Sequence, residues 1–217
     1  MARRTKEEAL ATREQLLDAA EQVFRERGVG HASLAEVADA AGVTRGAVYH
    51  HFESKVELFQ ALMARAEMPI DTAFEDFENQ DIADPLGLFR QQGLQALDHL
   101  TSSRQIQNIF EILYLRCEYT DELAPVAMQQ VQDRFECLAK CKAVLDQAVA
   151  KGQLPADTDT HLAAHGAFAF VSGLMRDWVE APDTFDLKAA APQLIDTYIA
   201  GLRANPPRRI ATTERLQ

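Results

Sequence analysis

Residues 34–52 read Leu-Ala-Glu-Val-Ala-Asp-Ala-Ala-Gly-Val-Thr-Arg-Gly-Ala-Val-Tyr-His-His-Phe. The stretch has what two short helices joined by a tight turn require: the small Ala38 where the helices cross, Gly42 in the turn, and the apolar Val48 to anchor the second helix. This spacing predicts a helix-turn-helix, whose second helix, 45–51, is sized to enter the major groove of DNA. The pattern alone leaves open a plain helical hairpin without a DNA-binding role.

The face of helix 45–51 that we expect to be exposed is polar and carries no negative charge. Arg45 can donate two hydrogen bonds to a guanine edge, and Gly46 lets a DNA backbone approach closely. Thr44, Tyr49 and His50 suit contacts to phosphates, which position a protein on the duplex.

Further phosphate contacts are expected beside this helix. Lys55 adds a cation in the first turn of the following helix, where backbone N–H groups are free, and Ser33 can act in the same way at the start of the preceding one. The basic residues at the extreme N-terminus are expected to contribute as well: Arg3, Arg4 and Lys6.

The rest of the chain also has helical periodicity, and runs of alternating β-branched residues are absent. Spacings typical of capping boxes begin at Thr5, Ser33 and Ser54, and Gly28 is placed to end the first helix. We therefore expect an all-α protein of about nine helices. Residues 1–53 would form a three-helix DNA-binding domain and residues 54–217 a larger helical ligand-binding and dimerisation domain, with the helix from residue 54 linking the two.

Charge is distributed unevenly over the 217 residues. The net charge of −11 argues against nucleic acid as a partner when taken over the whole chain. Residues 1–65, however, hold nine Lys and Arg against ten Asp and Glu, so nearly all the excess acid lies in the later part, with 13 basic and 23 acidic residues. Such an asymmetry suggests two different tasks, and it leaves the N-terminal part free to bind DNA.

These motifs resemble the TetR family of transcriptional repressors, and within it the AcrR-like regulators of multidrug efflux. The most specific similarity lies in Gly42-Val-Thr-Arg-Gly-Ala-Val-Tyr49, His51-Phe52 and Lys55, and weaker matches extend over nearly the whole chain, among them Glu111-Ile-Leu113 and Ser172-Gly-Leu174. The resemblance implies a homodimeric repressor that leaves its operator DNA when a small lipophilic or aromatic compound binds the C-terminal domain.

The resemblance also implies an effector pocket and a dimer interface in the C-terminal region. The small residues of 163–173 let two helices pack closely, and Leu194, Ile195, Tyr198, Ile199 and Leu202 give 187–204 an apolar face, so we expect these two helices to form the interface; closure of a monomeric core is the weaker alternative. The pocket candidates are apolar or aromatic with a few polar groups, a composition common in ligand sites and also in ordinary cores. They are Met63, Glu67, Ile70, Leu97, Phe110, Tyr114, Cys117, Cys137, Phe168, Met175 and Arg176.

Other functions remain as alternatives: a redox-sensing or metabolic regulator of the same type, or an all-α enzyme. Three Cys could sense oxidants, although reduced thiols in a cytoplasmic protein are the simpler expectation. His161 and His165 have i,i+4 spacing, but no carboxylate partner is placed to complete a metal site. We expect no enzymatic activity, cofactor, metal or membrane partner.

Overall fold

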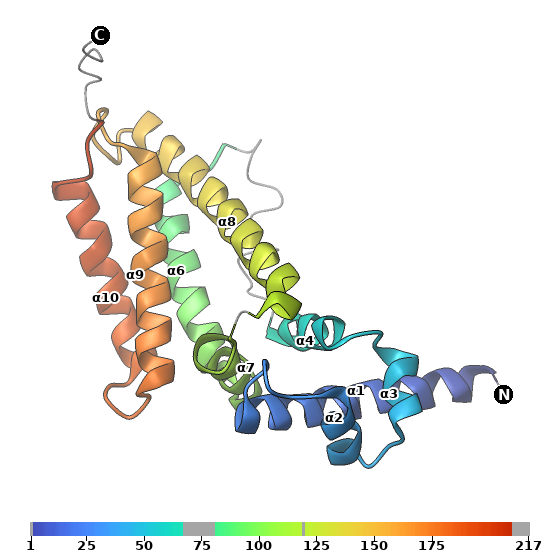
Figure 1. Ribbon diagram of the computed structural model, residues 1–217. Helices are drawn as coiled ribbons and strands as arrows, with labels where there is room; N and C mark the ends of the chain where they lie inside the picture. The colour runs from blue at the N-terminus through green and yellow to red at the C-terminus, as the bar shows by residue number, and fades with distance from the viewer. Residues whose placement is uncertain (1, 67–80, 119, 210–217) are drawn as a thin grey trace, which may run out of the picture. The chain divides into compact units, whose positions relative to one another are not determined.

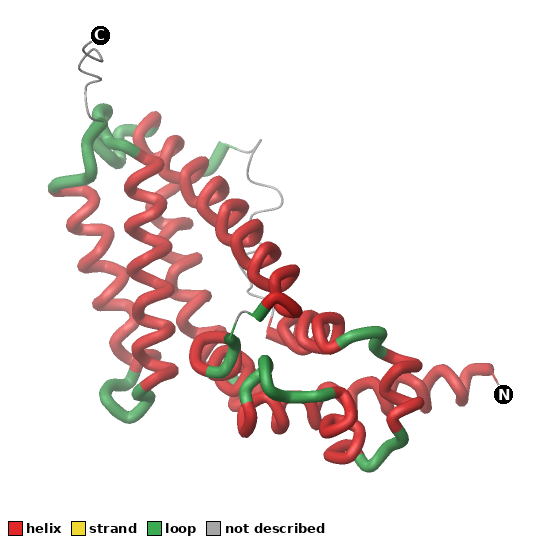
Figure 2. Tube along the Cα trace, viewed as in Figure 1, coloured by secondary structure: helices red, strands yellow, loops and turns green. Residues whose placement is uncertain are grey.

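The protein is seen in a computed structural model that describes residues 2–66, 81–118 and 120–209, with the backbone alone for residues 2–6. Over these ranges it has nine α-helices, two short 3-10 helices and no β-sheet, which confirms the predicted all-α class (Figures 1 and 2). None of the helices in the described ranges is long and apolar enough to cross a membrane.

The chain divides into two compact units. Residues Met1–Glu67 and Ser102–Val131 form the first, and residues Met68–Thr101 and Gln132–Gln217 form the second. The first unit extends beyond the predicted division at residue 53 and includes α7 (Arg104–Leu115), because this helix packs against α1 (Ala2–Arg27) although the two are far apart in the sequence.

Helix α1 organises the first unit, where it contacts α2 (Leu34–Ala41), α4 (Lys55–Met63) and α7. It begins at Ala2, so the cap predicted at Thr5 is wrong; Ala2, Arg3 and Arg4 are themselves good helix formers and extend the helix backward. Gly28 ends α1 as predicted, with a left-handed φ of 81° and its N–H bonded to the Phe24 carbonyl at 2.9 Å.

The turn between α2 and α3 (Arg45–His51) follows the sequence signals closely. Ser33 and Glu36 form the predicted reciprocal capping box at the start of α2. Gly42 follows α2 with φ 66° and donates its N–H to the carbonyls of Ala38 and Asp39. Val48, the only buried residue of α3, has no exposed surface.

The second unit is built from α6 (Pro85–Ser102), most of α8 (Ala124–Ala150), α9 (Thr160–Glu180) and α10 (Leu187–Ala204). Polar contacts join these helices: Arg90 of α6 pairs with Asp196 of α10, and the Thr160 hydroxyl of α9 donates to Asp146 of α8 at 2.6 Å. The buried core between them includes Leu97, Val144, Leu145, Ala163, Ala164, Ala167, Met175, Ile195, Ile199 and Leu202.

The apolar face of α10 therefore lies inside its own chain. Ile195, Ile199 and Leu202 are each at most 6% exposed, and the side chain of Ile195 approaches Gly93 of α6 so closely that a Cβ there would meet it at 3.0 Å. The prediction that this face meets a second copy is wrong for these three residues, because the helix buries them on its own neighbours. On α9 the small residues divide between the core and an exposed face, which carries Gly166, Ala169 and Gly173.

Replacing Gly42 should cost stability through the backbone alone. A Cβ at this position would meet nothing within 4 Å, so Gly42→Ala should lower the free energy of unfolding by about 1–2 kcal/mol, the cost of a left-handed conformation for an L residue. Gly42→Asn should lose less, because Asn tolerates that conformation better. Urea unfolding at one fixed protein concentration measures both, and equal losses for Ala and Asn would contradict the backbone explanation.

Candidate nucleic-acid interface and effector site

Helix α3 displays a set of exposed polar groups on a fixed base. Thr44 caps the helix, its hydroxyl accepting the Ala47 N–H at 3.3 Å. The buried Val48 holds the opposite side of the helix against α2. The structure thus brings five predicted DNA-binding residues together on one short exposed surface: Thr44, Arg45, Gly46, Tyr49 and His50.

The electrostatics of this surface favour an anionic partner. Helix α3 has no acidic residue, and its last turn carries His50 and His51. His50 is exposed, whereas His51 is half-buried; burial, then the neighbouring His50 and Arg13, lower the pKa of His51. His51 is therefore held neutral, and Arg45 with His50 is left to meet phosphates or base edges. Tyr49 adds an aromatic ring that is 59% exposed, and its hydroxyl can donate a hydrogen bond to a phosphate.

Sequence analysis missed Arg13 of α1 as a neighbour of this surface. Its guanidinium lies over the Phe52 ring, 5.2 Å from the centroid, and its charge acts on His51. Helical spacing gives no sign of this contact, because the two residues lie 39 positions apart in the sequence.

Lys55 has a different place from the one predicted. It is only 7% exposed, and its ammonium donates to the carbonyls of Gly30 and Ala32 at 3.1 Å each and pairs with Glu122 at 2.9 Å. An ammonium has three donors, and all three are engaged. In the structure Lys55 thus joins the start of α4 to the loop after α1 and to the 3-10 helix Asp121–Leu123. Its ammonium is engaged inside the chain and does not face outward as the predicted phosphate contact requires.

The other residues predicted to contact DNA either have a hydrogen-bond partner within the chain or have side chains outside the described part of the structure. The Ser33 hydroxyl donates to the Glu36 carboxylate at 2.8 Å, so its single donor is already directed to an anion, and this hydrogen bond lowers the pKa of Glu36. Arg3, Arg4 and Lys6 belong to the first turns of α1, but their side chains lie outside the described part of the chain.

The predicted effector residues are divided between the two units. In the first, Phe110 is buried, Met63, Tyr114 and Cys117 are half-buried, and the rings of Phe110 and Tyr114 lie 5.7 Å apart. In the second, Leu97 and Met175 are buried, Cys137 and Phe168 are half-buried, and Arg176 is exposed. Leu97 has no exposed surface, which favours the alternative of a plain core residue. Glu67 and Ile70 lie outside the described residues.

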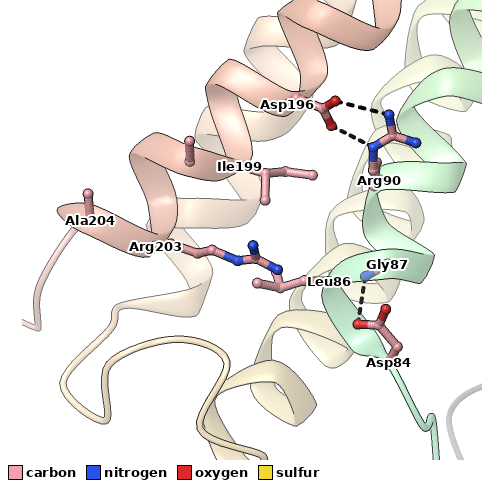
Figure 3. A pocket seen from close by; sticks show the side chains of 9 residues that line it. Asp84, Leu86, Gly87, Arg90, Asp196, Ile199, Arg203 and Ala204 are labelled. Carbon is pink, nitrogen blue, oxygen red and sulfur yellow. Dashed lines mark hydrogen bonds and ion pairs between the residues drawn. The ribbon is translucent and has the colours of Figure 1, made fainter.

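A hollow of about 620 Å³ lies in the second unit between α6 and α10 (Figure 3). Two of its charged side chains pair with each other, Arg90 with Asp196 at 2.5 and 3.0 Å, and a third, Asp84, accepts the Gly87 N–H at 3.0 Å. A Cβ at residue 87 would lie 2.1 Å from the Asp84 carboxylate, so a larger residue there would make that side chain shift. None of the predicted effector residues lines the hollow, and its four charged side chains do not suit a lipophilic compound.

Side chains that could bind a metal ion do not cluster in the described ranges. Over residues 2–66, 81–118 and 120–209, no three or more His, Cys, Asp or Glu side chains cluster closely enough to hold an ion. His161 and His165 are both exposed, with ring centroids 4.6 Å apart on α9.

Comparison with known proteins places the chain in a family. Residues 16–62 match the family described as bacterial regulatory proteins of the tetR family, and residues 84–204 match the C-terminal region of MAATS-type transcriptional repressors. The chain is 41% identical to the transcriptional regulator TtgR of Pseudomonas putida, over 96% of this chain and all of that protein. It is 39% identical to the repressor BepR of Brucella suis, over 93% of this chain and 97% of that one.

Solved structures agree with these sequence relatives. NalD, the secondary repressor of the MexAB-OprM multidrug efflux pump in Pseudomonas aeruginosa, superimposes with a TM-score of 0.83 at 31% identity, covering 92% of this chain and 99% of NalD. The complex of SmeT from Stenotrophomonas maltophilia with triclosan gives a TM-score of 0.76 at 28% identity, covering 95% of this chain and 99% of SmeT. The chain, with its helix-turn-helix and helical C-terminal region, therefore belongs to the TetR family of bacterial transcriptional regulators.

Proposed function

We propose that the protein is a homodimeric repressor that binds operator DNA through α3, controls a multidrug-efflux operon, and is released when a small lipophilic compound binds its C-terminal region. The observation that carries this proposal is the exposed, acid-free surface formed by Thr44, Arg45, Gly46, Tyr49 and His50 above the buried Val48. The efflux target is supported by the relatives, since NalD is a repressor of such a pump.

The charge distribution supports an approach to DNA through the N-terminal helices. Residues 1–65 are nearly neutral, whereas the rest of the chain carries most of the net −11. Phosphates repel the acidic part, so the reading helices are favoured as the point of contact. Neutralising carboxylates in the later part of the chain should for the same reason raise non-specific DNA binding.

Two copies are needed for the proposed mode of binding, because helix-turn-helix proteins read two half-sites about one helical turn or more apart. The exposed small residues Ala169 and Gly173 of α9 allow close helix packing and are our choice for the contact between copies. Leu162, 46% exposed on the same helix, adds apolar area to that face.

The alternative of an all-α enzyme gains no specific observation, and we do not pursue it. Of the pair Glu67 and Arg176, Arg176 is exposed and Glu67 lies outside the described residues.

Arg45→Ala should weaken specific DNA binding without affecting the fold. Losing a bidentate base contact costs about 1–3 kcal/mol, or roughly 5–150-fold in Kd, mainly against the specific duplex. Fluorescence anisotropy with duplexes from the promoter next to the protein's own gene, and with a scrambled duplex of equal length, measures the effect. Arg134→Ala, an exposed arginine on α8, is the matched control and should leave Kd unchanged. An unchanged Kd for Arg45→Ala would remove Arg45 from the proposed interface.

Lys55→Met, in contrast to Arg45→Ala, should lower the stability of the fold and should not remove a DNA contact. Removing the buried ammonium leaves the carbonyls of Gly30 and Ala32 and the Glu122 carboxylate without their partner. The free energy of unfolding should fall by about 1–3 kcal/mol per group left unsatisfied in the interior. The slope of log K against log salt should stay that of the wild type, whereas loss of a phosphate contact would reduce it by about 1. A reduced slope with unchanged stability would restore the phosphate role.

A further inference from the structure

Cys137 and Cys141 form a pair of thiols one turn apart on α8, in the second unit. Both are half-buried, neither takes part in a disulfide, and their side chains are hydrogen-bonded to each other. That hydrogen bond, together with burial, raises the pKa of Cys141, so Cys141 is held as a neutral thiol. We refer to these two side chains below as the α8 dithiol.

The α8 dithiol lies close to a well-fixed tyrosine. Burial, and then the neighbouring Cys141, raise the pKa of Tyr198 of α10 to about 12. The Tyr198 hydroxyl donates to the Ala163 carbonyl at 3.2 Å, and its ring stacks on Phe170 with centroids 4.9 Å apart. A Cβ on Gly166 would come within 2.8 Å of that hydroxyl, so glycine is required at residue 166 to admit it. The dithiol thus stands beside a rigid contact of α9 with α10.

The helical spacing of the α8 dithiol does not suit formation of a disulfide between the two sulfurs. Residues at i and i+4 of a helix have Cβ atoms about 5–6 Å apart, whereas a disulfide needs about 3.5–4.5 Å. A direct bond between Cys137 and Cys141 would therefore distort α8. Neutral thiols are also slow nucleophiles toward oxidants, and burial raises the pKa of the third thiol, Cys117, as well. These features argue against the redox-sensing alternative.

The same spacing suits an atom that bridges the two sulfurs. An atom bonded to both sulfurs spans a longer distance than a direct S–S bond, so it can join the two side chains without a change in the helix. Sulfur ligands favour soft atoms in such a bridge. We propose that the α8 dithiol is a binding site for trivalent organoarsenicals. Each of two As–O bonds in R–As(OH)₂ is replaced by an As–S bond, and each thiol proton leaves with a hydroxide as water. No electron is transferred, and the neutral thiols supply both protons that the two water molecules require.

Binding to the α8 dithiol does not depend on the proposed function, but its consequence does. Cys137 is one of the residues expected in the effector region of the repressor, so an arsenical held there would be an effector if the protein is released from DNA as proposed. Direct binding and release from DNA therefore need separate readouts.

The direct test uses phenylarsine oxide, at one equivalent per chain, on the fully reduced protein. Two of the three thiols should disappear from titration with Ellman's reagent, and intact mass should show one adduct per chain. Excess 2-mercaptoethanol should leave the adduct in place, whereas a small dithiol should remove it. The reason is that a competitor displaces a two-sulfur chelate effectively only if it carries two thiols in one molecule.

Single variants assign the adduct to the pair. Cys137→Ser and Cys141→Ser should each lose the adduct that resists 2-mercaptoethanol, with helical content by circular dichroism unchanged. Cys117→Ser is the matched control and should still lose two thiols. A resistant adduct that persists in either Cys137→Ser or Cys141→Ser, or three thiols left in the treated wild type, would overturn the proposal.

Anisotropy with promoter DNA distinguishes binding at the α8 dithiol from the effect of that binding on DNA affinity. In the wild type and in Cys117→Ser, the adduct should raise the Kd for the duplex at least tenfold, and in Cys141→Ser phenylarsine oxide should have no effect. An adduct without a change in Kd supports the site and overturns its effector role. Failure of the untreated protein to bind any promoter duplex would contradict the proposed function and leave the thiol result standing.

Discussion

A single buried side chain, Val48, anchors α3, the helix that carries the candidate DNA surface. Helix α3 has seven residues, well below the roughly 12–15 that an isolated helix needs for marginal stability in water. Val48 has no exposed surface, and α3 packs on α2, which in turn packs on α1. The exposed groups from Thr44 to His50 can therefore present a fixed pattern only while this framework is intact.

The framework extends into a later part of the sequence. Arg25 of α1 pairs with Glu111 of α7 at 2.9 Å, and the Asn108 amide of α7 donates to Glu21 of α1 at 2.6 Å. The Val29 N–H donates to the carbonyl of Arg116 at 2.9 Å. Together with the Lys55–Glu122 pair, these contacts make residues 102–131 part of the same compact unit as α2 and α3. Any ligand that displaces α7, where Phe110 and Tyr114 lie, would therefore act directly on the body that carries α3.

Local signals in the sequence predicted local structure well, and long-range contacts could not be predicted from them. Ser33, Glu36 and Gly42 act within four residues of their partners, so the spacing alone indicates their roles. Lys55 finds its partners 23 and 25 residues earlier and at Glu122, and nothing in the pattern around it reveals its burial. The apolar face of α10 illustrates the same limit: periodicity showed that Ile195 and Ile199 lie on one face, but not that their own chain covers it. The candidate DNA surface was largely predictable because it occupies one short helix, whereas the effector residues come from several helices.

Thermodynamic linkage between the two ligands tests the central claim most directly. If DNA and effector compete through one conformational equilibrium, each must change the affinity of the other by the same factor, typically about 5–150-fold. The measurement is isothermal titration of a lipophilic compound that binds the free protein, in the absence and presence of saturating promoter duplex. We expect the duplex to raise the Kd of the compound by the same factor by which the compound raises the Kd of the duplex. Equal affinity for the compound with and without DNA would contradict the account of a ligand-released repressor.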